Sequence, residues 1–341
     1  MLPAPRKQAA SSTFVRSHKI QWLDAPQTAP HQRAESNKLE PDVRRYYLLD
    51  VFTDRPLAGN PLAVVVDCDR LDPTAMQKIA AEFNLSETVF VLPPLDPVST
   101  ARLRIFTPKA ELSFAGHPTI GAAVLIGELR ASTLMRSQDV RIVLEEPVGR
   151  VTCLARHLPG RARQAEFALP KLPARIGDAQ SDEKIAAALG LTPDVIGFGR
   201  HQPAIISAGT PFTCVPVASR AALNAAWPRP DLFADAFAPA EAAHAYLYTR
   251  GTNDDFEARM FAPTLGVFED PATGAAAAAL AGALMQFEDI PDGHHALTIL
   301  QGAALGRPST IVLSLDVEDG RLTEAAIGGS AVIVAEGKLD L

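Results

Sequence analysis

The feature of this chain that most constrains its fold is a segment that occurs twice. Arg-x-Phe-x-Pro stands at residues 104–108 and again at 259–263, and each copy leads through a short loop to a helix start that carries Pro and Gly and runs into Ala-rich sequence. With a two-residue difference in loop length, His117 aligns with Asp270. Two consecutive matches favour a duplicated domain over the alternative, a coincidental five-residue motif.

The elements around these segments predict an α+β fold. Apolar alternation and short apolar runs predict strands at 46–52, 62–66, 88–92, 101–106, 140–144, 148–154, 204–217, 245–249, 256–261, 298–300, 309–315 and 331–334. Helical spacing and start signals predict helices at 72–83, 119–129 and 275–287, with short helical pieces in 219–241. Strands outnumber long helices and lack regular strand–helix–strand spacing, so a doubly wound fold is not expected.

The folded part is expected to begin near Arg44. Residues 1–43 are rich in Pro, Ser, Gln and basic side chains and hold no apolar period, which is typical of a disordered tail or an over-long start. Their likeness to a transit peptide is faint, because no amphipathic face appears. With 341 residues in total, the expected domains are 44–160 and 161–341, and the last strand could cross back to the first domain.

Charge and composition narrow the function classes. There are 32 Lys and Arg against 39 Asp and Glu, so the net charge of −7 argues against a nucleic-acid partner. The three cysteines show no zinc-site spacing and indicate free thiols in a reducing compartment. Because no stretch is long enough to cross a bilayer and the N-terminus lacks a signal-peptide core, we expect a cytoplasmic protein without a membrane partner. Walker, nucleophile-elbow and HExxH motifs do not occur in the sequence.

The two helix starts are candidates for binding an anion. A helix start exposes unpaired N–H groups and a partial positive charge, and Gly there lets a ligand approach the backbone. If the halves pack face to face, both starts point into one cleft that suits a small carboxylate-bearing molecule. The substrate contacts expected there come from Gly116, Pro118, Thr119, Ile120, Thr273, Gly274 and Ala275. Ordinary helix initiation without a ligand is the alternative.

Three titratable residues could carry proton chemistry. His117 and Asp270 hold equivalent positions and could orient a substrate or relay a proton, but packing explains a histidine and N-capping explains an aspartate equally simply. Glu87 leads into the apolar run 88–92, where desolvation would raise its pKa and suit it to abstract and return a proton. A solvated acid in a turn is the alternative for Glu87.

Several short motifs follow one another in a specific order. They are Asp-Val-Phe at 50–52, Gly-Asn-Pro at 59–61, Asn-Leu-Ser-Glu-Thr at 84–88, the two Arg-x-Phe-x-Pro segments, Gly-His-Pro-Thr at 116–119, Glu-Asp-Pro-Ala-Thr-Gly at 269–274, and Gln-Gly with Gly-Arg-Pro-Ser within 301–309. From about Tyr46 to Val334, this order resembles the phenazine biosynthesis PhzF-like family.

The resemblance implies a diaminopimelate epimerase-like fold, in which two pseudo-symmetric domains each wrap a curved, mostly antiparallel sheet around a central helix. It implies a proton shuttle at Glu87 with His117 and Asp270 as partners, no cofactor, no metal, and a homodimer. The phenazine enzyme carries Ser where this chain has Ala275, so one hydroxyl contact to the substrate is missing. Neither helix start carries the Cys of the two-base epimerases of this fold, so cysteine-based racemisation is not expected.

Together these observations predict a cofactor-independent isomerase of the PhzF-like family. It would move a carbon-bound proton in a small carboxylate-bearing metabolite, such as a cyclic one, with Glu87 as the acid and base. The alternative is a catalytically silent member that binds a metabolite or a protein partner. Incorporation of solvent deuterium into a bound candidate would separate the two.

Overall fold

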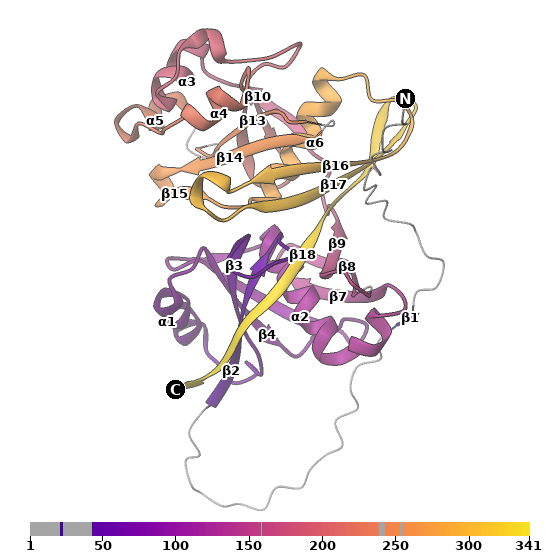
Figure 1. The fold of residues 1–341 in the computed structure, drawn as a ribbon. Helices are drawn as coiled ribbons and strands as arrows, with labels where there is room; N and C mark the ends of the chain where they lie inside the picture. Colours follow the sequence, from indigo (N-terminus) through magenta and orange to yellow (C-terminus); the bar gives the residue numbers. More distant parts are fainter. Residues whose placement is uncertain (1–20, 23–42, 158, 239–242, 253–254) are drawn as a thin grey trace, which may run out of the picture.

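The computed structural model describes residues 21–22, 43–157, 159–238, 243–252 and 255–341, and Figure 1 shows two halves stacked one above the other. The first half holds β2 (Val43–Val51), β3 (Asn60–Val65), α1 (Pro73–Phe83), β4 (Glu87–Leu92), β5 (Ala101–Phe106), β6 (Glu111–Leu112), α2 (Gly116–Met135), β7 (Val140–Glu146), β8 (Gly149–Arg156) and β9 (Arg163–Ala168). The second half holds β10 (Ala174–Asp178), α3 (Asp182–Leu189), β11 (Ala204–Ser207), β12 (Pro211–Pro216), α4 (Arg220–Ala225), α5 (Pro230–Ala236), β13 (Ala245–Arg250), β14 (Phe256–Ala262), β15 (Val267–Asp270), α6 (Gly274–Phe287), β16 (Gly293–Gln301) and β17 (Ser309–Glu318), and it leads into β18 (Arg321–Asp340).

The same order of strand pairings occurs in both halves. In the first half, β2–β3, β4–β5 and β7–β8 pair antiparallel, whereas β3–β4 and β5–β7 pair parallel. In the second half, β11–β12, β13–β14 and β16–β17 pair antiparallel, whereas β12–β13 and β14–β16 pair parallel. The central helix follows β6 in one half and β15 in the other. The duplication expected from the sequence is therefore present in the topology.

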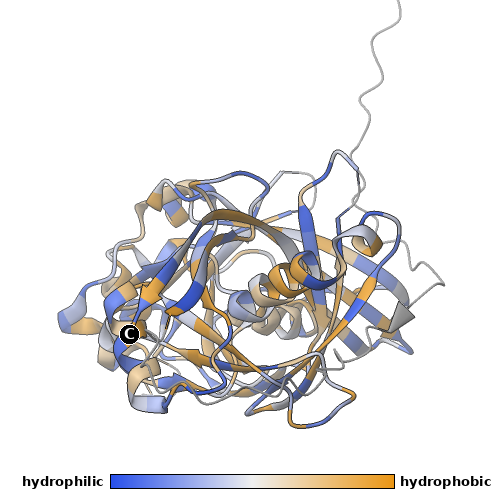
Figure 2. Cartoon of the chain, turned by 90° about the horizontal axis from the view of Figure 1, so that it is seen from below, coloured by the Kyte–Doolittle hydropathy of each residue, from blue (hydrophilic) through white to orange (hydrophobic). Residues whose placement is uncertain are grey.

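Each half is built around one helix. Helix α2 is buried at every position from Gly116 to Gly127 and contacts β7, β8, β9 and β18. Helix α6 is half alanine and contacts β10, β11, β12, β17 and β18. A helix that is apolar on all sides requires such enclosure. Figure 2 shows helical turns surrounded by strands.

The repeated Arg-x-Phe-x-Pro segment fastens equivalent strands. Arg104 pairs through two nitrogens with Glu111 on β6, at 2.7 and 2.6 Å, and Arg259 pairs likewise with Glu269 on β15, at 2.9 and 2.8 Å. Each guanidinium also lies over the Phe two residues further on, 5.1 and 4.6 Å from the ring centres. In each half this pair holds the short strand that precedes the central helix.

Strand β18 joins the halves, as Figure 1 shows. Its first part pairs with β17, its middle part with β9 and its last part with β2, in each case antiparallel. The sequence predicts only a strand over 331–334, because glycines before it and charged residues after it interrupt the apolar alternation. Pairing with three partners extends the observed strand to Arg321–Asp340. The domain boundary at residue 160 stays a prediction, and β9 beyond it pairs with β8.

Helix α2 is longer than expected. It begins at Gly116 rather than at residue 119, because the first turn tolerates Pro118. It ends at Met135 rather than at residue 129, across a non-helical residue at Ala131. The short elements β9, β10 and α3 were not predicted, since none carries an extended apolar pattern.

The expected tail at residues 1–43 lies almost wholly outside the described residues. The exceptions are Gln21–Trp22, which forms β1 and pairs in parallel with β7, and Val43, which begins β2. In the described part of the chain, no helix combines the length and the apolar character of a membrane span. Cys68, Cys153 and Cys214 are free and buried.

Candidate active site

The starts of the two central helices meet. A Cβ built on Gly116 would lie 3.2 Å from Cα of Gly274, and one built on Gly274 would lie 3.4 Å from Cα of Gly116. Side chains rarely tolerate so close an approach, so glycine at both positions permits the contact. The two segments that the duplication aligns are therefore neighbours in space.

Four backbone N–H groups remain without an acceptor at this meeting point. They belong to Gly116, His117, Gly274 and Ala275, and no described residue accepts a hydrogen bond from them. Both helix dipoles add partial positive charge at the same place. This arrangement favours a carboxylate or another electron-rich group.

Glu87 faces His117 beside the helix starts. Glu87 is the first residue of β4, and its Oε2 lies 3.4 Å from Nε2 of His117. Neither atom has a hydrogen-bond partner among the described residues. The His117 side chain is 5% exposed and that of Glu87 is 18% exposed, although Oε2 of Glu87 is itself buried. The accessible part of the Glu87 side chain therefore lies on its other atoms.

Asn60 links the two halves of the site. This fully buried residue begins β3, and its Nδ2 lies 3.0 Å from Oδ1 of Asp270 and 2.9 Å from the Ala272 carbonyl oxygen. The same nitrogen lies 3.3 Å from Nδ1 of His117. One amide of the first half thus contacts both residues that the duplication aligns.

Asp270 is held by groups of both halves. Its Oδ2 accepts a hydrogen bond of 2.5 Å from the Thr273 hydroxyl, and its Oδ1 lies 3.5 Å from the Ser86 hydroxyl. Nε2 of Gln301 donates to the Asp270 carbonyl oxygen at 2.8 Å and to the Thr273 hydroxyl at 3.1 Å. The Asp270 carboxylate therefore has fixed hydrogen-bond partners, whereas no described residue forms a hydrogen bond with Oε2 of Glu87.

Burial shifts the pKa values of the three titratable side chains of the site. It raises the pKa of the Glu87 carboxyl well above its ordinary value, and the nearby charge of Asp270 adds to this shift. Burial also raises the pKa of Asp270, against the lowering effect of hydrogen bonds such as that from Thr273. Burial lowers the pKa of His117 to about 3, so its imidazole is neutral near pH 7. A carboxyl group whose pKa is shifted towards neutrality can both accept and return a proton.

Most of the chain matches one family of known proteins. Residues 49–337 match the PhzC-PhzF family model, described as phenazine biosynthesis-like protein. The chain belongs to this family. An uncharacterized isomerase of Mesorhizobium japonicum is 48% identical over 310 residues, which cover 87% of this chain and 99% of the relative. The trans-2,3-dihydro-3-hydroxyanthranilate isomerase of Pseudomonas aeruginosa is 35% identical over 305 residues, with 87% and 99% covered.

A solved structure agrees with this assignment. A phenazine biosynthesis protein of the PhzF family from Bacillus anthracis has a TM-score of 0.77 and 25% identity, and the match covers 88% of this chain and 100% of the other. The PhzF-like family, the α+β fold and the enzyme class of an isomerase, all expected from the sequence, are confirmed.

Two further residues expected to contact the substrate, Thr119 and Ile120, lie inside the first half. Thr119 and Ile120 are fully buried. The Thr119 hydroxyl lies 2.8 Å from the Ala115 carbonyl oxygen and 2.8 Å from Oε1 of Glu146, and its N–H bonds to Ala115. A contact of Thr119 or Ile120 with the substrate stays a prediction. The backbone at Gly116 and Gly274 lies where the two helix starts meet.

Sequence reasoning missed three residues of the site. Asn60, Ser86 and Gln301 are not singled out by the sequence analysis, yet all three contact Asp270. The sequence did contain an indication of their importance, since each of the three lies in a motif that carries the family resemblance. Spacing alone could not show that these motifs converge.

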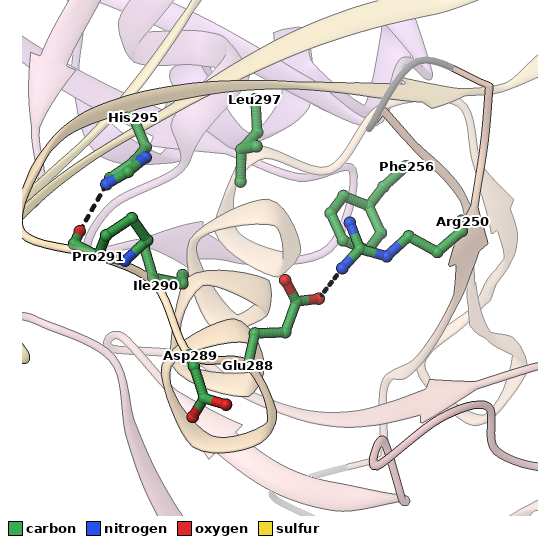
Figure 3. A pocket seen from close by; sticks show the side chains of 8 residues that line it. All are labelled: Arg250, Phe256, Glu288, Asp289, Ile290, Pro291, His295 and Leu297. Carbon is green, nitrogen blue, oxygen red and sulfur yellow. Dashed lines mark hydrogen bonds and ion pairs between the residues drawn. The ribbon is translucent and has the colours of Figure 1, made fainter.

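A separate pocket of about 280 Å³ lies at the end of α6 (Figure 3). Its lining contains none of the expected site residues, and its polar side chains have partners within the protein. Arg250 pairs with Glu288 at 2.5 Å, and Nε2 of His295 lies 2.7 Å from the Pro291 carbonyl oxygen. The described residues contain no group of three or more His, Cys, Asp or Glu side chains arranged to hold a metal ion.

Proposed function

We propose that this chain is an isomerase that moves a carbon-bound proton within a small carboxylate-bearing metabolite, with Glu87 as the acid and base. The observation that carries the proposal is the pairing of Glu87 and His117 at 3.4 Å, beside two helix starts with unpaired N–H groups. A base with a raised pKa thus lies next to groups that stabilise negative charge.

The reaction balances without an oxidant or a reductant. Glu87 removes a proton from a carbon atom next to a conjugated or carbonyl system, and the electron pair of the broken C–H bond remains on the substrate. The N–H groups of Gly116, His117, Gly274 and Ala275 stabilise the developing charge. Glu87 then returns the proton to a different carbon of the same system. His117 and Asp270 orient the reacting groups, His117 through its contact with Glu87.

The substrate class follows from the site and its relatives. A carboxylate suits the paired helix starts, and the name of the Pseudomonas aeruginosa relative contains a cyclic carboxylate, trans-2,3-dihydro-3-hydroxyanthranilate. Ala275 offers a backbone N–H but no hydroxyl, so we propose a related substrate that needs no hydroxyl contact there. A homodimer remains our prediction for the assembly.

Solvent exchange tests the proposal. The protein is incubated in D₂O with trans-2,3-dihydro-3-hydroxyanthranilate and related cyclic carboxylates, and proton NMR follows each carbon-bound hydrogen. The proposal predicts deuterium incorporation together with a shifted double bond. A compound that raises the melting temperature and never incorporates deuterium would favour the second candidate, a silent binder.

A further inference from the structure

Two neighbouring hydrogen-bond acceptors fix the orientation of the Asn60 side-chain amide. The backbone carbonyl oxygen of Ala272, 2.9 Å from Nδ2, can only accept a hydrogen bond. The nitrogen of the amide must therefore face it, because an oxygen there would oppose another acceptor. The carboxylate oxygen of Asp270, 3.0 Å from the same nitrogen, requires the same orientation.

This orientation determines what His117 can do on its Nδ1 side. The amide nitrogen of Asn60 carries two hydrogens and accepts no hydrogen bond. Nδ1 of His117 lies 3.3 Å from it and has no other partner among the described residues. The two hydrogens of the amide also serve Ala272 and Asp270, so Nδ1 can share one of them, whereas a proton on Nδ1 would meet no acceptor. Nδ1 is therefore the bare nitrogen. A neutral imidazole with a bare Nδ1 carries its proton on Nε2.

We infer that Asn60 is a positioning residue that holds His117 in the tautomer protonated on Nε2 and so makes His117 a hydrogen-bond donor to Glu87. Nε2 of His117 and Oε2 of Glu87 are 3.4 Å apart and otherwise unpartnered. Such contacts are often long without substrate and shorten in the reacting complex. The N–H group then orients Oε2 and leaves Oε1 to exchange the substrate proton. The role given to Glu87 rests on the proposed function, but the tautomer of His117 does not.

The same geometry excludes His117 as the base. Proton uptake would place hydrogens on both ring nitrogens, and the one on Nδ1 would face Asn60. The carboxylates of Glu87 on β4 and Asp270 on β15 would both favour an imidazolium. Burial opposes them and lowers the pKa of His117. Asn60 and burial therefore act together to keep a neutral donor between two acids.

NMR of the full-length protein with ¹⁵N-labelled histidine tests the inference without turnover. The chain has 8 histidines, and the signals of His117 are those lost in the His117→Gln variant. From about pH 5.5 to about pH 8, where ordinary histidines titrate, Nδ1 is expected to keep the shift of a bare nitrogen and Nε2 that of a protonated one. A proton on Nδ1, or a doubly protonated ring in this range, would overturn the inference.

Asn60→Asp provides the second readout, because it replaces the donor by an acceptor of the same shape. The ring is then expected to gain a proton on Nδ1 and to titrate with a higher pKa. Asn84→Asp makes the same change at an exposed position and should leave the His117 signals unchanged. Unchanged His117 signals in a folded Asn60→Asp protein whose new carboxyl is ionised, as its ¹³C shift reports, would also overturn the inference. If that variant does not fold, the measurement on the parent protein still decides.

Discussion

Gly116 and Gly274 lie against each other, with only 3.2 Å between the site of a Cβ on the first and Cα of the second. His117 directly follows one of these glycines, and Asp270, the last residue of β15, stands four positions before the other. The contact therefore brings the aligned residues of the two halves to one place, where Asn60 touches both. The duplicated fold makes one site from two helix starts.

Gly116→Ala is expected to destabilise the protein and weaken ligand binding. The added methyl group meets backbone atoms of the other helix, which cannot move aside as a flexible side chain could. Overpacking of this kind costs about 1–3 kcal/mol of unfolding free energy. Urea unfolding measures the loss. Gly177→Ala is the control, since its nearest neighbour would lie 3.7 Å away, and an equal loss there would contradict the account.

Arg259→Met is expected to cost far more stability than Arg104→Met. The Arg259–Glu269 side chains are only 6% and 3% exposed, so the substitution leaves a buried carboxylate without its partner. Breaking such a pair costs about 3–5 kcal/mol. The Arg104–Glu111 side chains are 22% and 34% exposed, and water can replace the lost partner at a cost of about 1 kcal/mol. Equal losses in denaturant unfolding would show that burial does not distinguish the two pairs.

Glu146 is expected to make the fold less stable as pH rises. Burial raises its pKa to about 8, against the effect of the hydrogen bond from Thr119. Between its unfolded pKa of about 4.3 and that value, the folded chain keeps a proton that the unfolded chain releases. The stability from this group is therefore full below the unfolded pKa and is lost as pH rises.

The Glu146→Gln variant removes this dependence. Its stability relative to the parent should increase with pH, by at most about 1.4 kcal/mol for each pH unit. Glu82→Gln, at an exposed position, serves as the control and should follow the parent. Thermal unfolding of both proteins from about pH 4 to about pH 9 measures this difference in stability, because the range spans the unfolded and the folded pKa of Glu146. A constant offset between Glu146→Gln and the parent would contradict a shifted Glu146.

Local patterns predicted the elements that carry strong apolar periods or start signals. The N-cap of α1 is Asp72, whose carboxylate accepts hydrogen bonds from two N–H groups of the first turn, as Asp before Pro predicts. The duplication predicted that two helix starts would be equivalent. Strand β18 was predicted at only a fifth of its length. Its glycines and charged residues interrupt the apolar alternation, and pairing with neighbouring strands holds the rest of it extended.

The site was predictable only in part, for a similar reason. Glu87, His117 and Asp270 stand out because their residue types suit proton chemistry. Asn60 is uncharged and lies 210 residues from Asp270 along the chain, so no spacing rule connects them. Thr119 is expected at the substrate because it belongs to a helix start, and its hydroxyl contacts Glu146, which no sequence pattern indicated. Which side of a helix start faces the ligand depends on packing of the whole half.

The central claim is that Glu87 is the acid and base, and deuterium exchange by Glu87→Gln tests it most directly. Gln keeps the size and the hydrogen-bonding capacity but cannot accept the proton, so exchange into a substrate should fall by about 10²–10⁴. Glu87→Asp should lie between the two, because its shorter side chain misplaces the carboxylate. Glu82→Gln is the matched control on an exposed position and should exchange at the parent rate. If a folded Glu87→Gln protein exchanges the proton as fast as the parent, Glu87 is not the base.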